Sequence, residues 1–244
     1  MKKILTLALA LIIGIGANAF GAAGQINAKF ELGAINNLYG HARLEADLTD
    51  GGVIIDNTDV TENLDTTAPM GFAFYGEYLY PIIKILKVGG GMGYSYQGNI
   101  PVRFGNTDVK DANNESLTYS ANIFPVYLTV QFHPIPEVEG LFVKGNLGLA
   151  LITSFAFSSP EIYNGYSKTL TSNMYYGIST GYEFASGFIC ELAFSAINYR
   201  VKYTDSNSRV FDDEGNLLDG LETSSRQTWH FSYRRIGLIA GFKF

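Results

Sequence analysis

Two features that commonly stabilise or anchor protein chains are nearly absent from this sequence. Cys190 is the only cysteine among 244 residues, so no intramolecular disulfide can form. The one long apolar run, from Ile4 to Ala17, has 14 residues, whereas a helix needs about 20 to cross a bilayer. The sequence therefore predicts neither a disulfide framework nor a membrane-spanning helix.

The apolar run belongs instead to a predicted signal peptide. Lys2 and Lys3 precede it, and Ala17, Asn18 and Ala19 form the small-x-small pattern after which signal peptidase cuts. We therefore expect residues 1–19 to be removed on export and residues 20–244 to form a single mature domain.

Positive charge is scarce in the mature chain. Residues 20–244 contain 15 lysines and arginines against 23 aspartates and glutamates, a net charge of about −8. Domains that bind nucleic acid usually carry a basic face, so no nucleic-acid partner is predicted. The sequence also lacks nucleophile-elbow, zinc-site and phosphate-loop patterns. We accordingly predict no catalytic residues, no metal and no cofactor.

The sequence is rich in alternating apolar and polar residues. Tyrosine, phenylalanine and glycine are abundant, at 16, 17 and 27 residues. Apolar side chains recur at every second position, which is typical of β-strands whose two faces meet different surroundings. The pattern predicts eight strands, at residues 25–36, 69–80, 86–98, 116–132, 141–155, 172–184, 188–203 and 229–244.

The joints between these strands alternate in length. Short joints follow the second, fourth and sixth strands, and the long joints span residues 38–68, 100–115, 156–171 and 205–228. The last strand, "RRIGLIAGFKF", alternates up to Phe244, which favours pairing with the first strand over a free edge. We predict an all-β fold, an eight-stranded antiparallel up-and-down transmembrane β-barrel with short periplasmic turns and long extracellular loops. A soluble lipocalin-like barrel is the alternative, although it should turn a polar face to water.

These features resemble the small outer-membrane β-barrel proteins of bacteria, the OmpA-barrel and OmpX-like group. Segments such as "FPVYLTVQF" and "MYYGISTGYEF" are similar to strands of the family described as the outer membrane protein β-barrel domain. The resemblance covers the mature chain and implies a bacterial outer-membrane location, with outer-membrane lipid and lipopolysaccharide as partners. It implies little about activity. We expect a monomer.

The predicted inner face of the barrel carries charges of both signs in nearly equal number. Side chains about fill the space inside eight strands, and buried charges persist when they are paired. We therefore predict a plug of ion pairs, and a narrow gated conduit lined by the same groups is the alternative. The residues are Lys29, Glu31, Glu77, Lys87, Lys144, Glu183, Glu191, Arg235 and Lys243.

Three strands change the phase of their apolar residues. In the fourth strand the change falls near Ile123, where we predict a β-bulge, and the seventh strand changes before Tyr199. In the last strand Trp229, Phe231 and Tyr233 lie on the face opposite the apolar residues that follow. Either this strand bulges, or the three aromatic side chains point inward and form a ligand mouth for a small hydrophobic molecule, as in OmpW-like barrels. An interfacial aromatic belt is the alternative to a ligand mouth.

The long joints are the predicted place of activity, because loops on rigid scaffolds commonly carry function. Joints 38–68 and 205–228 are acidic, with net charges of −6 and −4. We predict a structural or surface-interaction role in which these loops bind an extracellular partner. Binding or transport of a small hydrophobic molecule is the second hypothesis. A lipid A-modifying enzyme that uses His41 or His230 beside a serine and an acidic residue is the third.

One lipid contact is also predicted. Arg234 and Arg235 fall near the outer end of the last strand's apolar stretch, where the phosphates of the outer leaflet should lie. We expect both arginines to contact lipopolysaccharide.

Overall fold

The computed structural model describes residues 24–244 apart from 51–52, 69–70, 105–106, 109, 111–113, 136, 139, 159–165 and 212–216. The predicted signal peptide, residues 1–19, lies outside the described residues. Within the described part, all regular secondary structure is β-strand. No helix there is long and apolar enough to cross a membrane.

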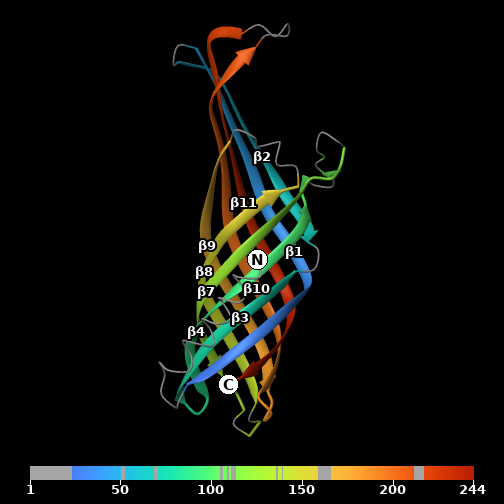
Figure 1. Ribbon diagram of the computed structural model, residues 1–244, viewed down its shortest axis with the longest axis vertical. Coiled ribbons are helices and arrows are strands. Elements are labelled where there is room, and N and C mark those ends of the chain that lie inside the picture. Colours follow the sequence, from blue (N-terminus) through green and yellow to red (C-terminus); the bar gives the residue numbers. More distant parts are fainter. Residues whose placement is uncertain are drawn as a thin grey trace, which may run out of the picture.

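Eight of the strands pair side by side in a closed antiparallel ring (Figure 1). The ring is complete because the last strand pairs with the first, and Phe244 exchanges two backbone hydrogen bonds with Ile26. In order around the ring, the strands are β1 (Gln25–Asp50), β3 (Phe72–Ile83), β4 (Leu86–Pro101), β7 (Thr118–Phe132), β8 (Leu141–Phe157), β9 (Ser167–Glu183), β10 (Phe188–Phe211) and β11 (Leu217–Lys243). The predicted eight-stranded up-and-down barrel is confirmed.

The two ends of the barrel differ as the joint lengths predict. Short turns join β3 to β4, β7 to β8 and β9 to β10 at the end where the chain terminates, at the bottom of Figure 1. We call this the short-turn end. The other end carries the long connections, including a small hairpin of β5 (Arg103–Phe104) and β6 (Thr107–Asp108).

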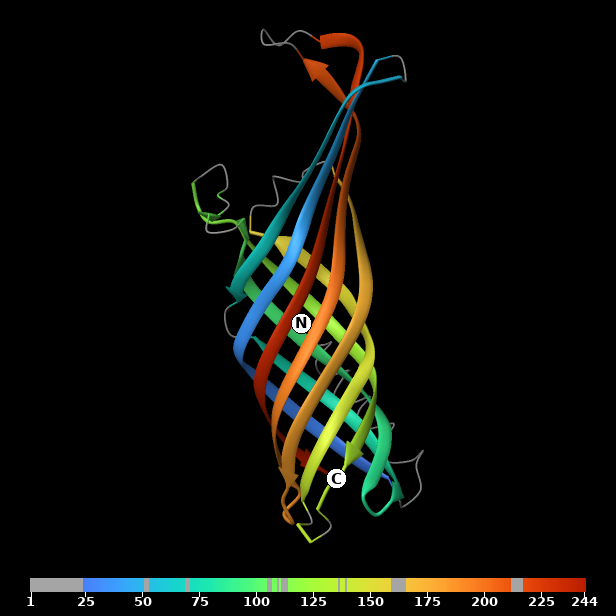
Figure 2. The ribbon, with the colours of Figure 1, turned by 180° about the vertical axis from the view of Figure 1, so that it is seen from behind.

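Two of the predicted loops are mostly strand, which corrects the expectation for residues 38–68 and 205–228. β1 continues to Asp50 and turns back as β2 (Val53–Ala68), while β10 continues to Phe211 and β11 begins at Leu217. These segments pair in the order β2, β1, β11, β10 and rise above the ring as a four-stranded extension (Figures 1 and 2). Alternation of apolar and polar residues does not mark these strands, because above the ring neither of their faces meets apolar surroundings.

At most of the predicted phase changes, the same side of the strand continues to face inward, and only the type of residue on that side changes. On β7, Tyr119 and Ile123 are buried together with Gln131, so the same side of the strand faces inward throughout. A register shift does occur between Asn122 and Ile123, as predicted, but the extra residue is Thr153 on the partner strand β8. On β10, Tyr199 likewise continues the inward face below it. The apolar residues at these points line the interior.

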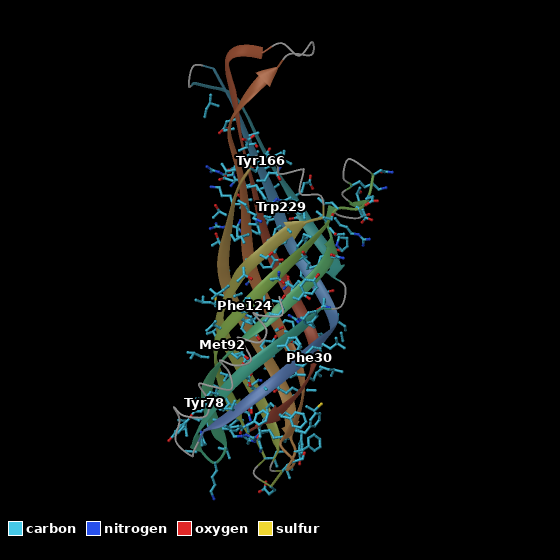
Figure 3. All side chains as sticks on the ribbon, in the orientation of Figure 1. Phe30, Tyr78, Met92, Phe124, Tyr166 and Trp229 are labelled. Carbon is cyan, nitrogen blue, oxygen red and sulfur yellow. The ribbon has the colours of Figure 1, made fainter. Side chains whose placement is uncertain are left out.

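The outer surface of the barrel carries a broad belt of exposed apolar side chains. Phe30 and Met92 lie on the outside of the ring, nearer the short turns than the extension (Figure 3). Leu128 on β7 is 75% exposed, although leucine is usually buried in soluble proteins. The belt includes Phe30, Leu32, Ile35, Phe74, Met92, Val126, Leu128, Val130, Leu147, Leu149, Leu151, Met174, Ile178, Leu192, Phe194, Ile236 and Leu238. An apolar surface of this extent suits contact with lipid.

We expect a charge in the belt to destabilise the barrel in a bilayer. Leu128→Arg should lower the free energy of unfolding by about 2–4 kcal/mol if Leu128 lies near the bilayer midplane. The measurement is denaturant unfolding in phosphocholine vesicles. Ser154→Arg, on the outer surface of β8 beyond the belt, is the matched control and should change stability little. Equal stability of the Leu128 variant and the control would show that the belt does not contact lipid.

Candidate functional site in the barrel interior

Four buried charged side chains form a closed ring of ion pairs across the barrel. Lys29 Nζ lies 2.5 Å from Glu77 Oε2 and 2.5 Å from Glu191 Oε1. Lys144 Nζ lies 3.0 Å from Glu77 Oε1 and 2.9 Å from Glu191 Oε2. The side chains come from β1, β3, β8 and β10 and are at most 2% exposed. We call this arrangement the ion-pair ring. Its two positive and two negative charges balance within the ring.

Two hydroxyl groups donate further hydrogen bonds to the two carboxylates of the ring. Tyr127 Oη donates to Glu77 Oε1 at 3.0 Å, and Ser179 Oγ donates to Glu191 Oε2 at 2.9 Å. A buried ion pair is tolerated when its remaining acceptor positions are hydrogen-bonded. The ion-pair ring meets this condition without an external ion.

A second ion pair lies beside the ring toward the extension. Arg235 Nε is 3.6 Å from Glu31 Oε1, and both side chains are at most 1% exposed. Tyr75 Oη donates to Glu31 Oε2 at 2.5 Å, and Arg235 Nη2 donates to Ser95 Oγ at 2.5 Å. Arg235 therefore belongs to the interior. The expectation that it reaches lipopolysaccharide is wrong, because an inward position alternates with the outward position of Arg234.

The remaining predicted interior charges gather at the short-turn end. Glu183 Oε2 lies 3.0 Å from Lys87 Nζ and 3.5 Å from Lys243 Nζ. Gln131 donates to Glu183 Oε1 at 2.7 Å. Lys243 is the most exposed member, with 36% of its side chain accessible. The nine residues thus form three layers along the barrel axis.

Above the charged layers, aromatic side chains fill the barrel. Tyr119 stacks on Phe155 with ring centroids 5.0 Å apart and lies 5.0 Å from Phe231. Phe157 lies 5.6 Å from Trp229. We call this group the aromatic plug. It comprises Tyr119, Phe155, Phe157, Tyr199, Tyr203, Trp229, Phe231 and Tyr233.

The predicted ligand mouth is part of this plug. Trp229, Phe231 and Tyr233 do point inward, without a register shift on β11 near Arg234. Their exposures are 5%, 3% and 1%, and other side chains of the chain occupy the space beside them. A ligand role for the three residues stays a prediction. The bulge at Thr153 contributes to the plug, because it turns Phe155 and Phe157 inward.

Glycines on the inner face leave room for these large side chains. A Cβ at Gly237 would lie 2.5 Å from Glu31 Oε1, and a Cβ at Gly91 would lie 2.7 Å from the ring of Tyr127. A small cavity of about 10 Å³ lies beside Lys144 and Tyr175. That is space for about one water molecule. The inward glycines therefore accommodate packed side chains in place of an open pore.

The two histidines of the enzyme hypothesis do meet, but on the outer surface. His41 and His230 are opposite each other on β1 and β11, and their rings stack at 4.5 Å. Burial lowers the pKa of His230, and His41 and Arg200 lower it further. Neither histidine is hydrogen-bonded to a serine or carboxylate among the described residues, and no cluster suited to a metal ion occurs there. The described geometry contains no triad.

Comparisons with known proteins find similarity of structure and none of sequence. No family model and no curated protein matches the chain. The outer membrane protein OprG from Pseudomonas aeruginosa is similar at 15% identity and a TM-score of 0.40, over 91% of this chain and 96% of that chain. The outer membrane protein AlkL is similar at 16% identity and a TM-score of 0.37, over 93% and 94%.

A third similar structure is Ail, the attachment invasion locus protein of Yersinia pestis, with 12% identity and a TM-score of 0.33 over 91% of this chain and 99% of that chain. At these values the comparisons carry no argument about activity. The class of the protein therefore follows from its own structure. It is a closed eight-stranded antiparallel β-barrel with an ion-paired and aromatic interior.

We expect the ion-pair ring to stabilise the barrel as a unit. Lys144→Met leaves Glu77 and Glu191 with excess buried negative charge and should lower the free energy of unfolding by about 3–5 kcal/mol. The double variant Lys144→Met/Glu191→Met keeps the Lys29–Glu77 pair and should be clearly more stable than the single variant. Denaturant titration in lipid vesicles measures both. A double variant as unstable as the single one would contradict this account of the ring.

Proposed function

We propose that the chain is an integral outer-membrane β-barrel whose lumen is closed and whose work is done at the cell surface by the four-stranded extension. The observation that carries this proposal is the filled interior. The ion-pair ring crosses the barrel, and the aromatic plug lies between that ring and the extension. A barrel whose interior is filled by side chains interacts with other molecules through its outer surface and its two ends.

The placement in a membrane is supported by the distribution of polarity. The outward residues form an apolar belt, while charges lie inside in pairs. A soluble barrel would bury its apolar face and expose the polar one. The closed ring also leaves no unpaired strand edge within the belt, which hydrocarbon requires. The predicted signal peptide supports export to the outer membrane.

The extension provides the surface for interaction. Beyond the level of the aromatic plug, β1 continues from Arg43 to Asp50, and 8 residues of strand at about 3.3 Å each reach roughly 25 Å. Arg43 holds the β1–β2 hairpin in shape through a bidentate contact with Asp59, at 3.0 and 2.6 Å. The extension therefore presents a β-surface in place of the predicted loops, and β2 at its side also pairs with β5 through Leu64 and Phe104.

Ion pairs with arginines on the same and neighbouring strands hold acidic residues on the surface of the extension. Arg43 lies 3.1 Å from Glu45, and Arg226 on β11 lies 3.5 Å from the same carboxylate. The described ion pairs thus link β2, β1 and β11 across the extension. Hydrogen bonding to Arg43 lowers the pKa of Asp59, so the contact persists in mildly acidic surroundings and is lost only as the pH falls through that lowered pKa.

The test is to shorten the extension while keeping the barrel. Residues 44–60 are replaced by a two-residue turn between the paired residues Arg43 and Thr61, and residues 206–224 are replaced likewise between Asp205 and Ser225. We expect the full and the shortened protein both to insert in the outer membrane and both to change their gel migration on heating, because the ring and the plug are untouched.

The functional measurement compares adhesion of cells that carry the full or the shortened protein to host-cell, matrix-coated and bacterial surfaces. We expect the full protein to increase adhesion at least several-fold over cells without it and the shortened one to have no effect. Uptake of small hydrophobic compounds should be the same in both strains. Unchanged adhesion, or uptake that depends on the full protein, would contradict the proposed function.

A further inference from the structure

A cluster of basic side chains lies on one side of the barrel, directly beyond the apolar belt. Arg200 on β10, His230 on β11 and His41 on β1 are cross-strand neighbours in one row. Lys202 lies two residues farther along β10, and Arg234 lies nearer the belt on β11. We call these five residues the basic outer patch. All five side chains are at least partly exposed.

The remaining strands present a different surface beyond their last exposed apolar residue. β7 presents Asn122 and Ser120, and β8 presents Ser154. Among the described side chains at this level, basic residues lie on the side formed by β10, β11 and β1 and at Lys168 on the neighbouring β9, whose ammonium donates to the Phe155 carbonyl. The patch is therefore a local feature in a mature chain whose net charge is about −8.

The nearby carboxylates do not neutralise this patch. Asp59 and Glu45 pair with Arg43 and Arg226, which lie farther along the extension. No ion pair involves Arg200, Lys202 or Arg234 within the described part of the chain. Arg200 and Arg234 are exposed and Lys202 is half-buried, and these three cations, which have no ion-pair partner among the described residues, form a site for an anion.

The position of the patch indicates an anion attached to an apolar group. Arg234 is the next outward residue after Ile236, which belongs to the belt. Its guanidinium carbon lies 4.8 Å from the centre of the Tyr39 ring, so the side chain is held at the border of the belt. Tyrosine is enriched where a membrane protein passes from hydrocarbon to headgroups. A ligand that contacts both regions needs acyl chains beside Ile236 and Phe194 and a negative headgroup beside Arg234 and Arg200.

We propose that the basic outer patch binds the phosphates of a lipid in the outer leaflet, of the lipid A class, with the lipid's acyl chains lying on the adjoining belt. Arg200 and Arg234 contact headgroup phosphates and Lys202 adds charge attraction, while the stacked imidazoles of His41 and His230 donate hydrogen bonds. The inference rests on the proposed membrane placement and extends it to one specific lipid site.

The experiment measures lipid retention by the full-length mature protein in detergent, using native mass spectrometry. The probes are diphosphoryl lipid A and a derivative with the same acyl chains but without phosphates. We expect the natural sequence to bind the phosphorylated probe preferentially. The variant Arg200→Gln/Lys202→Gln/Arg234→Gln should bind it about 10- to 100-fold more weakly, since each basic residue near an anionic lipid surface contributes appreciably.

The matched control removes three positive charges elsewhere, with Lys84→Gln at the short-turn end, Arg103→Gln in β5 and Lys110→Gln after β6. It should bind both probes as the natural sequence does. Equal weakening in the control, no preference for phosphate, or loss of inorganic polyphosphate binding with lipid A binding unchanged would each overturn the inference. Insertion in neutral phosphocholine vesicles is checked first, because failure at that step contradicts the membrane placement itself.

Discussion

The pairing of buried charges inside the barrel is the constraint on which the rest of the structure depends. Lys29 and Lys144 each contact both Glu77 and Glu191, so four strands are joined through their side chains across the barrel. Isolated charges in such surroundings would cost far more free energy than the fold could supply. The strand register must therefore bring all four residues to one level, and the inward glycines keep that level free of other side chains.

The aromatic plug extends the same closed interior toward the cell surface, by different chemistry. On β10 the inward face changes from Glu191 to Tyr199, and on β11 it changes from Arg235 to Phe231. Outward residues change in the opposite sense, from Phe194 to Arg200. On β10 and β11 the inner face thus changes from charged to aromatic near the upper border of the belt, while the outer face changes from apolar to basic. The same exchange places the aromatic plug inside the barrel and the basic outer patch outside it.

Much of the barrel could be predicted from the sequence, because alternation and joint length report directly on strands and faces. The inward positions of Lys144 and Glu191 follow from their alternation with leucines. Which lysine meets which glutamate does not follow, since that depends on the register between strands far apart in sequence. The inward position of Tyr119 was missed because apolar residues on either face produce the same alternation.

The extension was missed for a related reason. Its strands are polar on both faces, and their pairing depends on continuing the ladder between β1 and β11, which composition does not reveal. The bulges at Ala34 and Thr153 are likewise visible only against a partner strand. The paired His41 and His230 could be suspected from sequence, whereas the patch around them required the alignment of three strands.

The central claim is that the barrel is closed by its own side chains, and ion conductance tests it most directly. The mature protein, reconstituted in a planar phospholipid bilayer at high salt, should give no stable single-channel current, because the ion-pair ring and the aromatic plug leave no continuous water path. A variant with Tyr119, Phe155 and Phe231 all changed to alanine, together with Lys144→Met/Glu191→Met, should conduct if it still inserts. Steady conductance by the unchanged protein would contradict the account.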